Sequence, residues 1–272
     1  MFNQNYHNIV FEVTNKILEQ QKKSRNLFCL VSGPQGSGKT TFTGIIKKEL
    51  IKKKLKVLVL SIDDFYLSKK DRLQLSKKIS PLFITRGVPG THNLNFLKKV
   101  LNIFFSNKKK DYHLPYFSKA EDDIVKSRFH HLQFPYDVFI LEGWCINYQG
   151  ENNTSLKKPI NSMEKKFDQN MKWRNYVNKK SKEYFKTIYK KSNCSIFLRI
   201  PSFKYVFQYR TKQEKSIPKK KRMNAGQLKK FISFYERITK NLLVSKKNKF
   251  NIEISIKPNH NYAGLKYNNF KY

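Results

Sequence analysis

The chain has 272 residues, of which 39% are hydrophobic and 14% aromatic, so it contains enough apolar material for a substantial core. Lysine and arginine together number 56 against 19 acidic residues, which gives a formal net charge of +37. No apolar run approaches the roughly 18 residues of a membrane-spanning helix, and we expect no membrane partner. The N-terminal residues lack the pattern of a secretory signal. Three widely spaced cysteines predict neither a disulfide framework nor a zinc motif, which favours the cytoplasm; they are Cys29, Cys145 and Cys194.

The positive charge could indicate a nucleic-acid partner, but the residue usage favours compositional bias. Only nine of the basic residues are arginine, and the lysines are spread along the whole chain. Proteins that read nucleic-acid bases rely on the bidentate contacts of arginine. We therefore expect no specific nucleic-acid partner, and the sequence leaves the oligomeric state open.

Short apolar runs alternate with amphipathic stretches, a pattern typical of a parallel sheet covered by helices. Runs that are apolar throughout predict buried strands, and they lie at 27–31, 57–62, 138–141 and 195–200. Apolar residues at helical spacing predict helices at 5–24, 39–54, 93–105, 167–189, 201–213 and 227–244. We expect Asn93 to cap its helix and Pro201 to occupy the first turn of its own.

The stretches between these elements have no clean periodicity. We expect loop and short helix at 69–92, an excursion over the sheet at 107–135, a loop at 147–166 and a basic break at 216–222. Residues 250–256 alternate like an edge strand, and the tail from Lys257 is expected to be only partly ordered. The predicted organisation is one domain over 1–250, with an N-terminal helix at 5–24 and a substrate-side excursion at 69–135. An edge strand and a polar tail follow at 251–272.

A phosphate-binding loop lies between the first strand and the second helix. Its residues match G-x-x-x-x-G-K-[ST] in full, and with the next threonine they are the expected ATP-binding residues: Gly33, Pro34, Gln35, Gly36, Ser37, Gly38, Lys39, Thr40 and Thr41. The glycines allow successive N–H groups to point at a phosphate, and the helix adds its positive end. We expect Lys39 to reach the β- and γ-phosphates and the Thr40 hydroxyl to hold Mg²⁺.

Carboxylates follow two further strands, at Asp63, Asp64 and Glu142. Ligands of open parallel sheets bind beyond the carboxyl ends of the strands, so these side chains can share one crevice with the loop. Phosphoryl transfer needs a magnesium ligand and a group that orients the attacking hydroxyl. We therefore assign catalytic or metal-binding roles to Asp63 and Glu142, without deciding between base and ligand. Asp64 could instead cap the following helix.

Four segments together resemble the D-glycerate 3-kinases. They are SGPQGSGKTT at 32–41, SIDDFYLS at 61–68, TRGVPGTHNL at 85–94 and LEGWC at 141–145. This family belongs to the P-loop kinase group that also contains uridine kinase, pantothenate kinase and phosphoribulokinase. The resemblance extends over about residues 25–245, and RGVPGTH is the segment that indicates glycerate in particular.

The resemblance implies an α/β P-loop NTPase three-layer fold with a mainly parallel sheet and a helical cover on the substrate side. It also implies a kinase that uses ATP and Mg²⁺ to convert D-glycerate, a small hydroxy acid, into 3-phosphoglycerate. Carried over by position, Asp63 is the base or magnesium partner, and Glu142 is the acidic residue of the third strand. The candidates for the acceptor substrate are Asp64, Tyr66, Arg86, His92 and Lys119.

Departures from the family's pattern occur at Asn93, Ser118 and Ile124, all on the substrate side of the chain. They bear on the acceptor more than on the kinase assignment. One alternative is a uridine- or pantothenate-type kinase, and another is a P-loop nucleotide-binding protein that acts on nucleic acid. For single residues, Arg86 could form a surface salt bridge, and His92 could simply pack or cap.

Overall fold

A six-stranded sheet forms the centre of the protein in the computed structural model, which describes residues 4–215, 218–219, 222–244 and 250–268. The strand order is β2-β5-β1-β6-β7-β8. The parallel strands are β1 (Leu27–Ser32), β2 (Val57–Ser61), β5 (Val138–Gly143), β6 (Cys194–Arg199) and β7 (Ile252–Ile256), and β8 (Tyr262–Tyr267) is antiparallel to β7. All four apolar runs are strands, as predicted.

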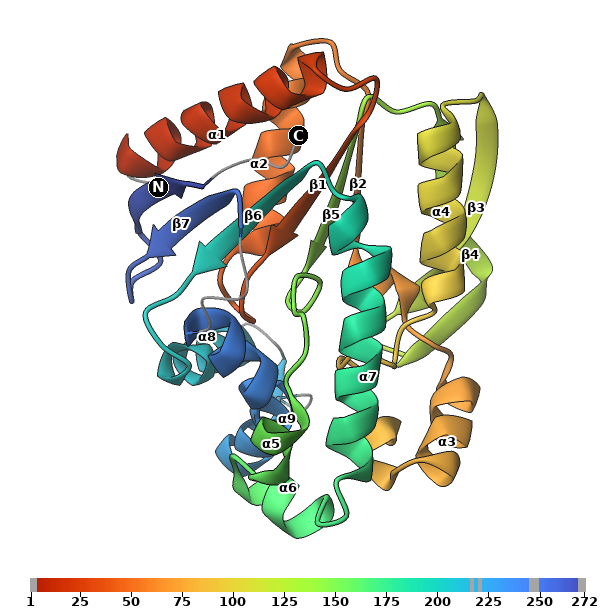
Figure 1. The fold of residues 1–272 in the computed structure, drawn as a ribbon, viewed down its shortest axis with the longest axis vertical. Coiled ribbons are helices and arrows are strands. Elements are labelled where there is room, and N and C mark those ends of the chain that lie inside the picture. Colours follow the sequence, from red (N-terminus) through yellow and green to blue (C-terminus); the bar gives the residue numbers. More distant parts are fainter. Residues whose placement is uncertain (1–3, 216–217, 220–221, 245–249, 269–272) are drawn as a thin grey trace.

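Helices cover both faces of this sheet (Figure 1). Successive side chains of a strand point to opposite faces, so Phe28 and Leu30 enter one core cluster while Leu27, Cys29 and Val31 enter the other. The first cluster includes α4 (Leu94–Ser106) and α7 (Lys172–Thr187), and the second includes α1 (Gln4–Lys22) and α2 (Lys39–Lys52). The protein therefore has the three-layer P-loop NTPase fold that the sequence predicted.

Further helices lie beyond the carboxyl ends of the central strands (Figure 1). They are α3 (Lys69–Lys78), α5 (Asn153–Lys157), α6 (Ser162–Phe167), α8 (Lys204–Lys215) and α9 (Ala225–Val244). Arg237 joins α9 to α6 and to the preceding segment, because its buried guanidinium donates to both carboxylate oxygens of Glu164, at 2.8 and 2.6 Å, and to Glu151 at 3.1 Å. This ion cluster links separate segments of the helical cover.

The segment at 107–135 corrects the sequence prediction. It forms an antiparallel hairpin of β3 (Lys110–Ser118) and β4 (Asp123–Phe134), a separate sheet that packs against α4 and the short 3-10 helix η1 (Ile62–Phe65) instead of lying over the main sheet. Leu114, Leu132 and Phe134 join the α4 core cluster. A register shift between Pro115 and Tyr116 interrupts the alternation, which hid the strand period in the sequence.

Other boundaries also differ from the prediction. The stretch 147–166 contains α5 and most of α6, the helix after Pro201 begins only at Lys204, and the helix predicted from 167 begins at Lys172. The strand predicted as an edge, β7, is covered by β8, so the tail after Lys257 supplies the true edge. Tyr262 of β8 is buried against Tyr6 of α1, with ring centroids 4.5 Å apart. Four residues of the predicted basic break, 216–217 and 220–221, lie outside the described residues, as does 269–272 of the tail.

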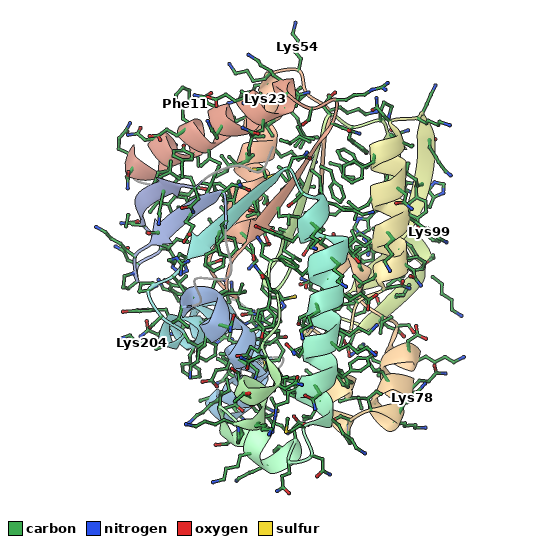
Figure 2. All side chains as sticks on the ribbon, viewed as in Figure 1. Phe11, Lys23, Lys54, Lys78, Lys99 and Lys204 are labelled. Carbon is green, nitrogen blue, oxygen red and sulfur yellow. The ribbon has the colours of Figure 1, made fainter. Side chains whose placement is uncertain are left out.

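Asn93 caps α4 as predicted, since its side chain accepts from the backbone of Asn95 and Phe96. The three cysteines are free and buried. Lysines project from different sides of the molecule, as Lys54, Lys78, Lys99 and Lys204 show in Figure 2. Over the described part of the chain, no helix has the length and apolar character needed to cross a membrane.

Candidate active site

The ends of three neighbouring strands form the centre of the site. Glu142 of β5 lies in register between Val31 of β1 and Ser61 of β2. The phosphate loop follows β1, and Asp63 follows β2 within η1. The parallel sheet therefore brings the loop and the two predicted carboxylates to one edge.

The phosphate loop curls over its own lysine. Lys39 Nζ donates to the carbonyls of Gly33 and Pro34, each at 2.9 Å. Burial lowers the pKa of Lys39, while the charges of Glu142 and Asp63 act in the opposite direction. The Ser37 hydroxyl is buried and has no hydrogen-bond partner among the described residues. A loop with a half-buried ammonium and a spare hydroxyl fits an anionic phosphate ligand.

Thr40 and Glu142 form the second part of the site. Thr40 Oγ1 donates to Glu142 Oε1 at 2.8 Å, and Thr43 Oγ1 lies 3.4 Å from Glu142 Oε2. Burial raises the pKa of Glu142, against the hydrogen bond from Thr40 and the charge of Lys39. Hydroxyl and carboxylate oxygens suit Mg²⁺, which uses one or two protein ligands together with substrate phosphates and water. These residues fit the predicted metal role.

Asp63 has both carboxylate oxygens engaged. Lys119 Nζ lies 2.7 Å from Oδ2, and the Tyr66 hydroxyl donates to Oδ1 at 2.7 Å. Burial alone would raise the pKa of Asp63, but Lys119 and the Tyr66 hydrogen bond outweigh it and hold the pKa below its usual value. Lys119 comes from the β3–β4 hairpin turn, so the hairpin contributes directly to the site.

Asp64 has a structural partner. Its Oδ2 accepts a hydrogen bond from the Ser61 backbone amide at 2.7 Å, in a capping box at the start of η1. Asp64 therefore caps the helix that follows β2, the alternative to a site role that the sequence analysis gave. Its Oδ1 lies 3.8 Å from His130 Nε2 on β4. Burial raises the pKa of Asp64, partly offset by the Ser61 hydrogen bond.

The RGVPGTH segment forms a braced loop beside Asp63. Gly87 has φ +125°, and an added Cβ there would come within 2.3 Å of the Tyr235 hydroxyl of α9. Trp144 Nε1 donates to the Gly87 carbonyl at 2.9 Å. His92 pairs with Tyr66 through an isolated β-bridge, and their rings stack at 4.6 Å. The loop therefore has a defined shape in which only glycine suits position 87.

Arg86 is already paired within the protein. Its guanidinium contacts Asp122 Oδ1 and donates to the Lys119 carbonyl at 3.2 Å. Asp122 also faces the buried Arg72 at 3.0 Å. A substrate carboxylate at Arg86 would therefore share the guanidinium with Asp122, a residue that sequence reasoning missed.

His92 is 5% exposed and has one occupied ring nitrogen. Its Nδ1 lies 2.9 Å from the Tyr184 hydroxyl, and its Nε2 has no partner among the described residues. Burial lowers the pKa of His92 to about 4, against the charge of Asp63. The sequence analysis did not identify Tyr184 as a site residue, because it lies 92 positions after His92 in the chain.

A cavity of about 490 Å³ opens beside the phosphate loop. The loop contributes Gly36, Ser37, Gly38 and Thr41, and the other walls include Tyr209, Lys212, Gln213 and His260. His260 Nε2 lies 2.9 Å from the Gly36 carbonyl, and its ring is 3.8 Å from that of Tyr209. Aromatic walls next to a phosphate loop fit a nucleotide base. His260 was not predicted, since it lies in the tail that was expected to be partly ordered.

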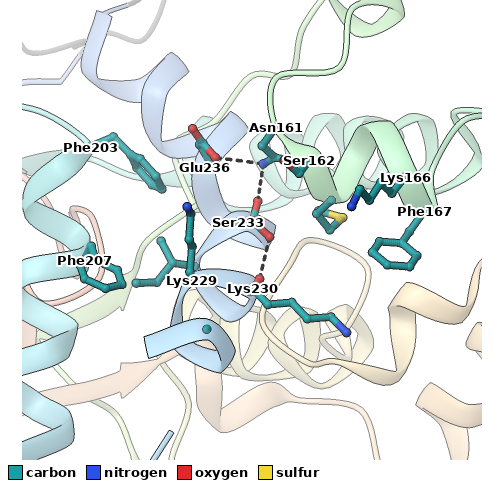
Figure 3. Close-up of a pocket in the computed structure, with 13 residues that line it drawn as sticks. Asn161, Ser162, Lys166, Phe167, Phe203, Phe207, Lys229, Lys230, Ser233 and Glu236 are labelled. Carbon is teal, nitrogen blue, oxygen red and sulfur yellow. Dashed lines mark hydrogen bonds between the residues drawn. The ribbon is translucent and has the colours of Figure 1, made fainter. Parts of the chain in front are cut away.

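A second cavity of about 670 Å³ lies among α6, α8 and α9 (Figure 3). Phe203, Phe207 and Phe167 supply much of its apolar wall, with Lys229 and Lys230 beside them. It contains none of the predicted site residues, so it is separate from the strand-end site.

A parallel sheet, a complete phosphate loop opening α2, and carboxylates at the ends of β5 and β2 are features of the P-loop kinase class. No family model matches the chain. Among curated proteins, it is 28% identical to the uncharacterized kinase mug58 of Schizosaccharomyces pombe, over 84% of this chain and 85% of that protein. It is 37% identical to the probable ATP-dependent kinase TDA10 of Saccharomyces cerevisiae over 55% of this chain, but spans only 58% of that protein.

The chain is also 26% identical to the chloroplastic D-glycerate 3-kinase of Arabidopsis thaliana over 67% of its own length and 40% of that enzyme's. Among solved structures, D-glycerate 3-kinase from Cryptococcus neoformans superposes with a TM-score of 0.80 at 22% identity, covering 95% of this chain and 99% of that one. The chain therefore has the fold of the P-loop kinases and is similar in sequence to kinases, among them a D-glycerate 3-kinase.

Proposed function

We propose that the chain transfers the γ-phosphate of ATP to the primary hydroxyl of D-glycerate and uses Mg²⁺ in doing so. The observation that carries the proposal is the position of Asp63, which follows β2 next to Glu142 of β5 and accepts a hydrogen bond from Tyr66, the residue that bridges to and stacks on His92 of the RGVPGTH loop. One carboxylate thereby connects the phosphate end of the site with its acceptor end. The resemblance of the RGVPGTH segment to D-glycerate 3-kinases, and the names of two similar proteins, support this acceptor.

The phosphate end would work by charge and position. Lys39 would exchange its bonds to the loop carbonyls for phosphate oxygens, and the spare Ser37 hydroxyl would gain an acceptor. Thr40 and Glu142 are the residues that would hold Mg²⁺, which when bound neutralises charge on the phosphates. The cavity lined by Tyr209 and His260 would bind the adenine base of ATP.

The acceptor end would orient the hydroxyl. The lowered pKa of Asp63 keeps its carboxylate ionised at neutral pH, so it accepts a hydrogen bond readily but is a weak base. Phosphoryl transfer through a loose transition state depends more on positioning than on proton removal, so an orienting carboxylate is sufficient. Arg86, Lys119 and the Nε2 side of His92 would supply the donors around a small acid.

The test is ATP consumption measured against a panel of acceptors: D-glycerate, L-glycerate, uridine, pantothenate and single-stranded RNA. We expect D-glycerate alone to stimulate ADP release strongly, with 3-phosphoglycerate as the product identified by phosphorus NMR. Faster reaction with uridine or pantothenate would assign the protein to a neighbouring kinase family. ADP release that responds only to RNA would contradict a small-molecule acceptor altogether.

A further inference from the structure

The hydroxyl of Tyr184 on α7 contacts two parts of the RGVPGTH loop. The backbone amide of Gly90 donates to the phenolic oxygen at 3.0 Å, and the backbone amide of His92 also faces that oxygen. His92 Nδ1 lies 2.9 Å from the same oxygen. Amides can only donate, so they use the acceptor capacity of the hydroxyl, and its single proton points to Nδ1.

This arrangement decides which nitrogen of His92 carries the proton. Because Nδ1 accepts from Tyr184, a neutral imidazole must be protonated on Nε2. Burial favours the neutral ring, since it lowers the pKa of His92 to about 4. Nε2 is buried without a partner among the described residues, and the stacked ring of Tyr66 limits rotation of the imidazole. The Nε2–H group of His92 is therefore a donor in a fixed position, without a hydrogen-bond acceptor among the described residues.

We propose that Tyr184 is a positioning residue that locks His92 as the Nε2–H tautomer, so that His92 presents a fixed donor to an oxygen of the acceptor substrate. The proposal rests on the proposed function in one respect, namely that this oxygen belongs to a hydroxy acid. A buried donor without a partner discriminates strongly, because an acceptor that lacks the matching oxygen leaves it unpaired. The pair thus contributes to the choice of acceptor.

The tautomer is measured by NMR on protein with ¹⁵N-labelled histidine rings. The chain has six histidines, and the His92→Gln variant assigns the His92 signals. We expect Nδ1 in the unprotonated range and Nε2 in the protonated range in the wild type, and a mixture of tautomers in Tyr184→Phe. Tyr136→Phe is the matched control, because it also removes a hydroxyl that accepts from a backbone amide, in the turn before β5 and outside the site. A wild-type ring protonated on Nδ1 would overturn the proposal.

Kinetics separate positioning from folding. In Tyr184→Phe we expect the KM for D-glycerate to rise roughly tenfold, the scale of one misdirected hydrogen bond, while the KM for ATP stays the same. His92→Gln, whose amide nitrogen can replace Nε2–H, should retain more affinity for the acid than His92→Leu. An unchanged KM for the acid in Tyr184→Phe, or equal losses for ATP and the acid, would refute the role of Tyr184. If D-glycerate is not phosphorylated at all, the proposed function fails, while the NMR result still decides whether Tyr184 holds the tautomer.

Discussion

Replacement of Arg237 by methionine removes the ion cluster that joins α9 to α6. The guanidinium makes two bonds to Glu164, one to Glu151 and one to the Lys158 carbonyl at 2.7 Å, and the Glu164 side chain is only 1% exposed. Without the arginine, Glu164 is a buried carboxylate with no compensating charge in the cluster. Such a loss destabilises a protein by about 3–5 kcal/mol. For a chain of this size we therefore expect the melting temperature to fall by roughly 6–20 °C.

The assay is thermal and urea unfolding followed by circular dichroism. Lys52→Ala is the control, because it breaks an exposed pair with Glu49 and should change the free energy of unfolding by no more than about 0.5 kcal/mol. Adding Glu164→Gln to Arg237→Met should recover part of the loss, since it removes the uncompensated charge. If Arg237→Met unfolds with the same midpoint as Lys52→Ala, the cluster does not hold the helical cover and the reasoning is refuted.

Further predictions concern the site and the charge. Lys39→Ala should lower turnover by about 10²–10³ in an ADP-release assay, the scale of one preorganised charge contact; a folded variant with near-normal turnover would exclude this lysine from the phosphate site. Lys119→Ala should move the acid limb of the kcat/KM profile to higher pH, because Lys119 holds the pKa of Asp63 down and burial then raises it; an unmoved limb, with Lys99→Ala as the control, would contradict that coupling. Arg86→Lys keeps the charge but loses the planar fork, so the KM for the acid should rise while that for ATP does not. Equal losses would assign Arg86 to the nucleotide. Finally, RNA binding measured by fluorescence anisotropy should be weak and largely lost by about 150 mM salt, whereas sequence-selective binding there would show a dedicated nucleic-acid site.

The sequence was informative wherever the determining interactions are local. The phosphate loop needs consecutive residues, 33–40, and the buried parallel strands are continuous apolar runs, so both were predicted with their positions. The convergence of Asp63 and Glu142 at one edge followed from the general geometry of parallel sheets, and the register of β5 between β1 and β2 agrees with it. The cap at Asn93 is equally local, because its donors lie only two and three positions further along the chain.

Only the tertiary structure decided the contacts between distant parts of the chain. The β3–β4 hairpin brings Lys119 to Asp63 and Asp122 to Arg86, although its bulge leaves no readable period in the sequence. The strand β8 pairs with β7, and its Tyr262 packs against Tyr6 of α1, far away in the chain. Tyr184 likewise contacts His92 from α7, a distant element. A hydrogen bond or buried pair between separated segments depends on how whole elements pack, and no local pattern of residue types encodes that packing.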